Sequence, residues 1–469
     1  LLKEECLRSV RDGNPSTSIP VAKAANKAGS PLNSIHILAA FLAVPPPSAA
    51  HSSTCQPTHT RWQHCSASSS LFSSRMRAWF FANTRERPLE PDDELLGGAR
   101  YGGPNVQQMD EVPDAEIHDP HDIVVQVHAV ALNPLDYKRR QGVLKMLLSE
   151  NWPHVIGYDL SGVVAACGRD VTKFKVGDEV FGMLPHDSNG SLADFVSVHE
   201  DYMASKPKNL TSLAITDLLA MHFRHIEAAA LPLVSLTALE AFRAGGLAEE
   251  KKVLITGGAG GVGSVAIQIA KSVFKARIVA TTASSKKIER MKSLGANEVV
   301  DYARDHFERE LTEYDFALDC TAEVSNSNES TCDEDGAARK CFECVTRNGA
   351  VVSISETPTS RSFSTSIGMQ GVQVNSFVGF ILDCLSGSIV RKARQANIDY
   401  EYFFSAANGN VMDEIRQLCE DGKLVPVIDK VFPFEKADVA MEYLEAGHAT
   451  GKVVVELAVV PTKNTTSSV

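Results

Sequence analysis

A glycine-rich turn between an apolar strand and an amphipathic helix constrains this chain more than any other segment. It lies in the stretch Lys251-Lys-Val-Leu-Ile-Thr-Gly-Gly-Ala-Gly-Gly-Val-Gly-Ser-Val-Ala-Ile-Gln-Ile-Ala-Lys271. Gly258, Gly260 and Gly263 have the G-x-G-x-x-G spacing, which permits a tight turn, close approach of a pyrophosphate and close helix–strand packing. The helix N-terminus would offer free N–H groups to phosphates. We therefore predict a dinucleotide site here; the alternative is a glycine-rich turn that binds nothing.

The following strand indicates which dinucleotide. Proteins that bind NAD usually carry Asp or Glu about 20 residues after the glycines, where it holds the ribose 2′-OH. The corresponding segment reads Ala276-Arg-Ile-Val-Ala-Thr-Thr-Ala-Ser-Ser-Lys-Lys287, and no acid occurs between Gly263 and Glu289. Hydroxyl and ammonium groups at this place suit a 2′-phosphate. The sequence therefore favours NADPH, although Lys286 and Lys287 could instead only solubilise a helix start.

Strand and helix patterns divide the chain into a β-rich part and an alternating part. The β-rich part has predicted strands at 76–81, 122–130, 160–165, 179–182 and 195–198. A predicted helix over 227–242 leads to strands at 252–256, 277–281, 298–300, 315–319 and 350–354, with helices at 261–274, 285–294 and 412–421. Such alternation predicts an α/β fold with a doubly wound parallel sheet. A last strand at 451–457 is expected to return to the first domain.

Composition and charge exclude some classes of function. The chain has 469 residues, 44% of them hydrophobic, which is enough for two globular domains. The net charge is −12; because the first 75 residues carry +4, the remainder carries −16. Such an acidic body is a poor nucleic-acid binder. The apolar run 35–44 is too short to cross a bilayer, which takes about 20 residues, so no transmembrane segment is predicted.

The N-terminal extension, residues 1–75, has the composition of a targeting segment. Residues 13–85 contain no Asp or Glu, and 61–75 hold six serines and two arginines. Organelle transit peptides are rich in Arg and Ser and poor in acids, and a plain disordered tail is the alternative. Two further segments, 212–224 and 323–336, are interpreted as inserts. A lone C-x-x-C, Cys341 to Cys344, falls on a predicted helix, where packing is favoured over redox or zinc use.

Seven motifs in order resemble the medium-chain dehydrogenase/reductase superfamily. Before the glycine turn they are ALNPLDYKRRQG from Ala131, GYDLSGVV from Gly157, GDEVFG from Gly177 and GSLADFV from Gly190. The glycine turn is the fifth, and LGANEVVDY from Leu294 and GHATGKV from Gly447 follow it. Within the superfamily the chain is most similar to the quinone oxidoreductase branch, including the mitochondrial reticulon-interacting NADPH oxidoreductases and the chloroplast alkenal/enone reductases. The resemblance implies a GroES-like β-rich catalytic domain (76–226 and 429–469) and a Rossmann NADP-binding domain (227–428).

The zinc branch of that superfamily has an early Cys, a Gly-His-Glu motif and a four-cysteine lobe. Here those first two places read Asn133-Pro134-Leu135-Asp136 and Gly157-Tyr158-Asp159, and no four-cysteine cluster occurs. Without thiolate or imidazole ligands there is no Lewis acid to ionise an alcohol. Reduction of a quinone or an activated double bond needs no metal, because the nicotinamide hydride adds to an electron-poor carbon. No metal site is therefore predicted.

The resemblance also implies roles for individual residues. Lys138 matches a lysine near cofactor and substrate that could donate to the nicotinamide ribose or to the carbonyl oxygen. It is therefore predicted both as the one catalytic residue and as a cofactor-binding residue; a surface lysine beside Arg139 and Arg140 is the alternative. Gly258, Gly260, Gly261, Val262 and Gly263 are expected at the pyrophosphate, Ser284 and Lys287 at the 2′-phosphate, and Tyr302 at the adenosine. Tyr302 could equally be a packed aromatic at a strand end.

The sequence thus predicts an NADPH-dependent reductase of quinones or α,β-unsaturated carbonyls that acts without zinc. The alternative is an NADPH-binding scaffold or redox sensor with little turnover, at a membrane-protein complex. The loop after Asp319 departs from the family pattern, which gives this alternative some weight. The resemblance further implies a homodimer and a mitochondrial location, with chloroplast or cytoplasm as alternatives.

Overall fold

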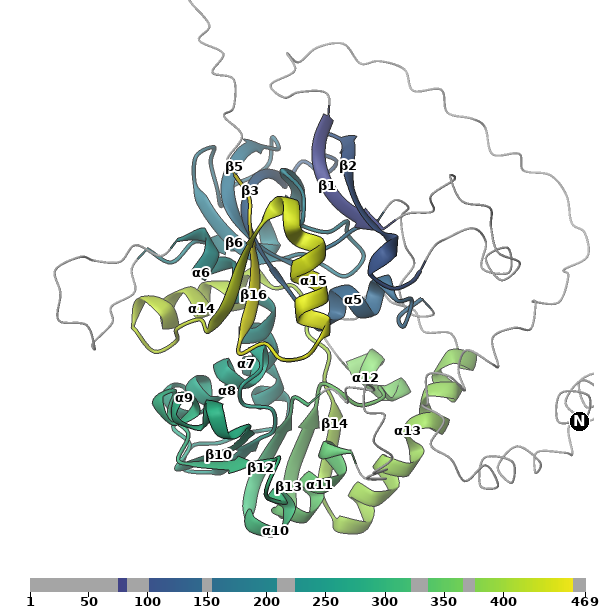
Figure 1. The fold of residues 1–469 in the computed structure, drawn as a ribbon, viewed down its shortest axis with the longest axis vertical. Helices are drawn as coiled ribbons and strands as arrows, with labels where there is room; N and C mark the ends of the chain where they lie inside the picture. Colours follow the sequence, from purple (N-terminus) through teal and green to yellow (C-terminus); the bar gives the residue numbers. More distant parts are fainter. Residues whose placement is uncertain are drawn as a thin grey trace, which may run out of the picture. The chain divides into compact units, whose positions relative to one another are not determined.

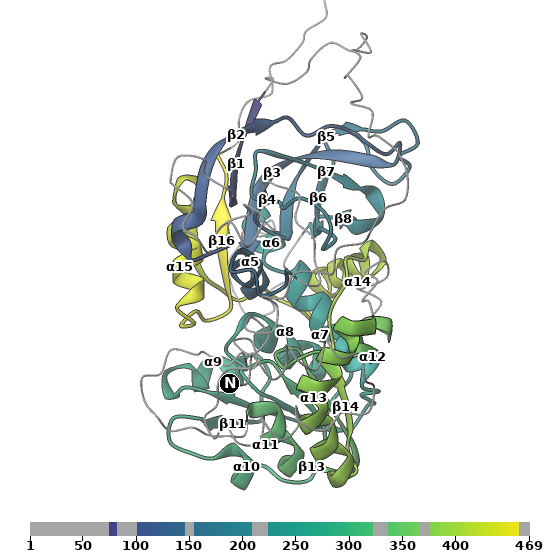
Figure 2. The same ribbon diagram turned by 90° about the vertical axis from the view of Figure 1, so that its right-hand side faces the viewer.

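The computed structural model describes residues 75–81, 101–145, 154–208, 224–321, 336–365 and 376–458 (Figures 1 and 2). All of them belong to one compact unit. Most of the N-terminal extension and nearly all of the two expected inserts, 212–224 and 323–336, lie outside the described residues.

The first half of the described chain, together with the C-terminal strands β15 and β16, builds two sheets whose strand pairs are antiparallel except for the parallel pair β15–β16. The larger sheet has the order β15-β16-β3-β5-β6-β8, with β7 paired to β3, and a smaller sheet has the order β2-β1-β4. The C-terminal strand β16 pairs antiparallel with β3, so the predicted return of the chain to its first domain is confirmed (Figure 2). The strands are β1 (Arg75–Phe81), β2 (Gln107–Pro113), β3 (Asp122–Leu132), β4 (His154–Val155), β5 (Asp159–Cys167), β6 (Glu179–Met183), β7 (Phe195–His199), β8 (Met203–Ser205), β15 (Ile428–Pro433) and β16 (Lys452–Glu456).

The predicted doubly wound sheet is confirmed as six parallel strands in the order β11-β10-β9-β12-β13-β14. Helices cover both of its faces (Figure 1). The strands are β9 (Lys252–Ile255), β10 (Ile278–Ala283), β11 (Glu298–Asp301), β12 (Tyr314–Asp319), β13 (Val345–Ser353) and β14 (Asp399–Tyr402).

The helices of the whole described chain are α5 (Pro134–Arg140), α6 (His225–Ala229), α7 (Pro232–Ala244), α8 (Gly261–Ser272), α9 (Ile288–Ser293), α10 (Phe307–Glu310), α11 (Ala337–Cys344), α12 (Ser360–Thr365), α13 (Ser376–Ala396), α14 (Gly409–Glu420) and α15 (Ala437–Glu445), with short 3₁₀ turns at 104–106, 200–202, 285–287 and 434–436.

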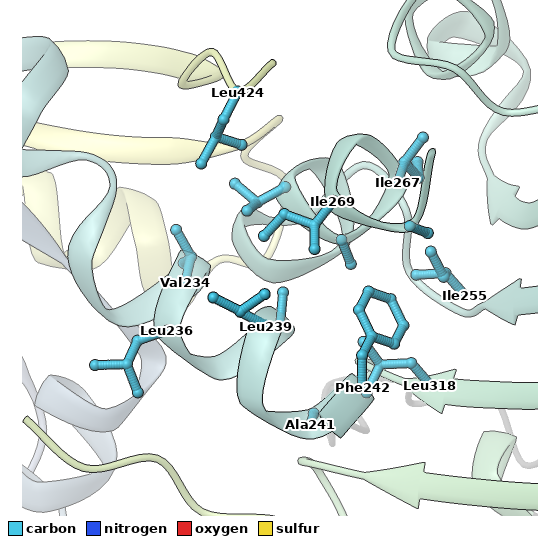
Figure 3. Close-up of a cluster of buried hydrophobic side chains, with 14 of the residues drawn as sticks. Val234, Leu236, Leu239, Ala241, Phe242, Ile255, Ile267, Ile269, Leu318 and Leu424 are labelled. Atoms are coloured by element: carbon cyan, nitrogen blue, oxygen red, sulfur yellow. The ribbon is translucent and has the colours of Figure 1, made fainter. Parts of the chain in front are cut away.

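Alternate residues of each parallel strand enter two separate cores. Val253 and Ile255 of β9 join the cluster formed with α7, α8 and α14, whereas Leu254 joins the one formed with α11 and α13. This alternation follows from the two-residue side-chain period of a strand that is buried on both faces. Figure 3 shows Phe242 of α7 packed against Ile255 and Leu318 at the ends of β9 and β12.

The helix predicted over 227–242 is wrong as a single helix. The chain forms α6 and α7 with a break before Pro232, whose ring has no N–H for a continuing helix. The break lets α6 pack on the larger antiparallel sheet while α7 packs on the parallel one. The stretch His225–Ala244 is long and apolar enough to cross a membrane, but 78% of its most apolar window is buried inside the protein. It is therefore a core segment.

Helix α11 contains the C-x-x-C pair, which confirms that this motif lies on a helix. Cys341 and Cys344 are both fully buried, and burial raises the pKa of the Cys344 thiol to about 12. A thiol with that pKa stays protonated near neutral pH and neither binds metal nor exchanges disulfides readily. The pair therefore contributes packing between α11 and its neighbours.

Candidate cofactor and substrate site

The glycine turn lies between β9 and α8, and two of its motif glycines are required by packing. A Cβ on Gly258 would lie 2.0 Å from the hydroxyl oxygen of Thr281, and one on Gly263 would lie 2.3 Å from the carbonyl oxygen of Gly257. Gly257 itself has φ +64°, a conformation that favours glycine. At Gly260 the nearest atom would be 3.3 Å from an added Cβ, so this glycine faces more open space. The turn therefore has the tight geometry that the spacing predicts.

The sequence at the N-terminus of α8 supplies no side chain that caps its first N–H groups. Gly260 is the N-cap residue and has no side chain to accept from the first amides, and the first turn holds no acidic residue. The first N–H groups of a helix have no partner within it, and with the helix dipole they attract an anion. Gly261 and Val262 begin this turn and are half-buried. These features fit the pyrophosphate of a dinucleotide.

A loop from the C-terminal part of the chain lies against the glycine turn. Gly451 N donates to Ala259 O at 2.9 Å, and Gly451 forms a parallel bridge with Gly260. Just before it, the carbonyl oxygens of His448 and Ala449 accept from Lys287 Nζ at 3.1 and 3.3 Å. The structure thus brings Lys287 toward the glycine turn. Because an ammonium has three N–H donors, one remains for a phosphate.

The remaining residues expected at the adenosine end lie where β10 and β11 end. Ser284 follows β10 and is half-buried. Tyr302 follows β11, and 63% of its surface is exposed. A packed aromatic would be buried, so the packing alternative for Tyr302 is wrong, and its ring is accessible to a ligand.

Sequence reasoning missed an acid at this end of the sheet. Asp301 lies at the end of β11, paired in register with Ala283 of β10, and its carboxylate accepts from the Ser285 hydroxyl. It also accepts from Ala303 N at 3.1 Å, and these hydrogen bonds, Ser285 first, hold its pKa below the usual range. The acid of NAD-binding proteins ends the strand that follows the glycines, which here is β10, whereas Asp301 ends the neighbouring strand β11. Since the Ser285 hydroxyl donates to Asp301, Ser284 is the serine left for a phosphate.

Lys138 lies on α5, a short helix that begins after Asn133. Its side chain is half-buried, burial lowers the pKa of its ammonium, and its Nζ has no hydrogen-bond partner among the residues that the structure describes. The neighbouring arginines are buried rather than part of a basic surface: Arg139 donates to the Tyr158 hydroxyl at 2.6 Å, and Arg140 pairs with Glu445 at 2.6 Å. Lys138 is therefore the member of this run that is left available for a ligand.

Two residues of the segments that replace the zinc-branch motifs, Asn133 and Asp159, form a hydrogen-bonded group with Lys452. Asp159 is fully buried and accepts from Lys452 Nζ at 3.1 Å, Asn133 Nδ2 at 3.0 Å and Leu233 N at 2.8 Å. Lys452 Nζ also donates to Asn133 Oδ1. Desolvation raises the pKa of Asp159, while the ammonium of Lys452 opposes that shift. Over the described ranges, no three His, Cys, Asp or Glu side chains are grouped so that they could hold a metal ion.

This ion pair is continuous with the glycine turn. A Cβ on Gly261 would lie 3.2 Å from Lys452 Cδ and 3.1 Å from Val234 of α7. Lys138 lies on the helix that begins beside Asn133, which is a partner of Asp159 and Lys452. At the start of that helix, Asn133 N donates to Asp136 Oδ2 at 2.7 Å. Burial raises the pKa of Asp136 to about 7. The structure thus joins the glycine turn, Lys452, Asp159 and the start of α5 into one buried group.

Comparisons with known proteins agree with this architecture. A family model described as "Alcohol dehydrogenase GroES-like domain" matches residues 119–208, and one described as "Zinc-binding dehydrogenase" matches residues 294–455. The 2-methylene-furan-3-one reductase of Solanum lycopersicum is 34% identical over 366 residues, covering 76% of each chain. NAD(P)H oxidoreductase RTN4IP1, mitochondrial, of Homo sapiens is also 34% identical, covering 73% of this chain and 83% of its own. The solved quinone oxidoreductase from Coxiella burnetii has a TM-score of 0.61 at 26% identity, covering 82% of this chain and 100% of its own.

The fold and the glycine turn define a two-domain oxidoreductase with a GroES-like domain and a Rossmann-type domain. The chain belongs to the medium-chain dehydrogenase/reductase superfamily, with relatives among the enone and quinone reductases.

Proposed function

We propose that this protein reduces quinones or α,β-unsaturated carbonyls with NADPH, without zinc. The observation that carries the proposal is the side-chain set at the place of the metal ligands. Asn133 and Asp159 lie in the segments that replace the zinc-branch motifs, and both are hydrogen-bonded to each other and to the ammonium of Lys452. The names of relatives support the reaction class: besides the tomato reductase, an Arabidopsis thaliana relative is named NADPH-dependent alkenal/one oxidoreductase, chloroplastic.

The residues of this chain would bind the cofactor in three places. Gly258, Gly260, Gly261, Val262 and Gly263 would hold the pyrophosphate at the open end of α8. Lys287 and Ser284 would hold the 2′-phosphate, with Tyr302 against the adenosine. When bound, the nicotinamide supplies a hydride to an electron-poor carbon.

Lys138 would stabilise the charge that develops on the substrate oxygen. An N–H donor with no other partner can donate to that oxygen, and a half-buried ammonium does so in lower dielectric than water. Its lowered pKa also makes transfer of a proton to the enolate or quinol oxygen easier. The product would therefore leave protonated without a metal to hold its oxygen.

The N-terminal extension would direct the protein to mitochondria. Its acid-poor composition supports this, and several relatives carry the word mitochondrial in their names, although another is chloroplastic. The partner proposed for the catalytic site is a small-molecule quinone or enone.

The test is oxidation of NADPH by the full chain, which is measured as the loss of NADPH absorbance. The acceptors are an ortho-quinone, a para-quinone and a reactive enone, and NADH replaces NADPH as control. Turnover with NADPH but not NADH would support the reductase and its 2′-phosphate site. Binding of NADPH with no turnover of any acceptor would favour the scaffold or sensor function instead.

A further inference from the structure

One buried carboxylate gathers four hydroxyl groups at the carboxyl ends of three parallel strands. Asp319, the last residue of β12, is 1% exposed. Its Oδ1 accepts from the hydroxyls of Thr256 at 2.7 Å and Thr321 at 2.6 Å. Its Oδ2 accepts from Ser353 at 2.8 Å and Ser355 at 2.6 Å. We call these five residues the Asp319 hub.

The hub lies at the point where the strand order of the sheet reverses. From β9 the chain continues through α8 to β10 on one side, whereas β12 and β13 lie on the other side. Ligands of open α/β sheets bind outside the carboxyl ends of the strands at this point. Ser284 and Lys287, which follow β10, lie on the adenosine side of β9. The hub, on the opposite side, is therefore placed for the nicotinamide half of a dinucleotide.

Burial and acceptor contacts separate the hub into an inner and an outer pair. A hydroxyl has one hydrogen to donate, and all four donate to Asp319. The inner pair, Thr256 and Ser353, is fully buried, and each also accepts from a backbone amide: Thr256 from Cys320 N at 3.1 Å and Ser353 from Glu356 N at 3.2 Å. The outer pair, Thr321 and Ser355, is half-buried. Toward a ligand these two oxygens offer lone pairs alone.

We propose that Asp319 positions the nicotinamide half of the cofactor by holding Thr321 and Ser355 as hydrogen-bond acceptors. The ribose hydroxyls and the carboxamide NH₂ of a nicotinamide nucleoside are donors and match such acceptors. Phosphate oxygens only accept, so this end of the sheet is unsuited to the pyrophosphate or the 2′-phosphate. The inference rests on the proposed function, and it makes Asp319 a positioning residue that acts through Thr321 and Ser355.

The test compares two nucleotides on the full chain by calorimetric titration. NADPH carries both halves of the cofactor, whereas 2′,5′-ADP carries only the adenine half with the 2′-phosphate. In Asp319→Asn the new amide NH₂ donates, so two of the four hydroxyls must turn away from it. Loss of hydrogen bonds to a charged group predicts that NADPH binds about tenfold weaker or worse. Binding of 2′,5′-ADP should stay within about twofold of the wild type.

Two further variants keep the test decisive. Ser355→Ala retains the carboxylate and removes one outer acceptor, so it should weaken NADPH selectively even if Asp319→Asn fails to fold. Ser272→Ala is the matched control, because that hydroxyl donates to Gln268 O within α8 at 2.7 Å, away from the strand ends.

Three outcomes would overturn this inference. Equal loss of both nucleotides would show that the hub only holds the sheet end together, and unchanged NADPH binding in both variants would show that it does not serve the cofactor. A wild-type chain that binds neither nucleotide would instead reject the proposed dinucleotide site, and with it the role of the hub.

Discussion

At the scale of single residues, burial and hydrogen bonding distinguish the three basic side chains of α5. Arg139 and Arg140 are buried against Tyr158 and Glu445, and both guanidiniums are engaged in hydrogen bonds. Lys138 is half-buried, and desolvation lowers the pKa of its ammonium. A general acid is most effective when its pKa approaches the working pH. Among these three neighbours, Lys138 alone has the environment of a proton donor.

Replacing Lys138 by Met tests this role. Met keeps the length of the apolar stem and removes the N–H groups, so kcat should fall about 100-fold while NADPH affinity stays nearly unchanged. In the wild type, kcat should decline as the pH rises, because only the protonated form of Lys138 is active. The midpoint of this decline should lie below the ordinary lysine pKa of about 10.4, because burial lowers the pKa of Lys138. The variant should lack that decline. Steady-state kinetics across pH measure both effects, with exposed Lys145→Met as control; an unchanged kcat would contradict the role.

Replacing Lys287 by Met tests cofactor choice. The variant loses the spare donor and the positive charge beside the proposed 2′-phosphate, so the KM for NADPH should rise about tenfold. The KM for NADH, which lacks that phosphate, should change little. Exposed Lys286→Met is the control and should have the smaller effect. An equal rise for both cofactors would mean that Lys287 matters only for holding the carbonyls of His448 and Ala449.

The sequence located residues that follow one strand, but not contacts made between strands. The expectations for Gly258, Gly263 and Lys287 came from a single stretch of chain, in which spacing is visible. Asp301 meets Ser285 only because β10 and β11 pair in parallel. Asp319 likewise gathers hydroxyls from the ends of β9 and β13. Such juxtapositions depend on strand order and register, which single-strand patterns do not specify.

At the scale of elements, long periodic segments were predictable and short or interrupted ones were not. The strands of the parallel sheet are apolar on both faces, so most of their residues are hydrophobic and easily recognised. The edge strand β14 is rich in polar residues, and α13 contains two glycines and several serines, which weakened both signals. The break between α6 and α7 depends on two different cores competing for one apolar stretch, and it was missed for that reason.

Gly263→Ala tests the packing of α8 on β9. A Cβ there would contact backbone atoms of the glycine turn, which cannot rotate away, so the helix must shift. Overpacking of this kind should lower the free energy of unfolding by about 1–3 kcal/mol and weaken NADPH binding as the helix N-terminus moves. Urea unfolding and nucleotide titration measure the two effects.

The control for that substitution is Gly387→Ala on α13. Among the residues that the structure describes, no atom outside the backbone of the helix itself lies within 4 Å of a Cβ built there, so alanine should stabilise the helix by about 1 kcal/mol. If Gly263→Ala were equally stabilising, close helix–strand packing would not be the reason for glycine in the motif.

At the scale of the whole molecule, an ion pair of the larger sheet contacts two helices, α7 and α8, that pack on the parallel sheet. Asp159 begins β5 of the larger antiparallel sheet and accepts from Leu233 N in the first turn of α7, which packs on the parallel sheet. Lys452 begins β16, and its stem lies against Gly261 of α8. Both side chains are nearly or fully buried, so their charges depend on each other and on Asn133. A change in either residue should therefore affect both the stability of the fold and the geometry of the glycine turn.

The two partners of this pair should not be equally costly to remove. In Asp159→Val the Lys452 ammonium stays buried with Asn133 Oδ1 as its remaining partner, and an uncompensated buried charge costs about 3–5 kcal/mol of unfolding free energy. In Lys452→Met the carboxylate keeps two donors, Asn133 Nδ2 and Leu233 N, so the loss should be smaller, about 1–3 kcal/mol. The double variant should be more stable than Asp159→Val alone, because no charge is then stranded. Urea unfolding of the three variants measures this cycle, and strictly additive losses would show that the pair does not act as one unit.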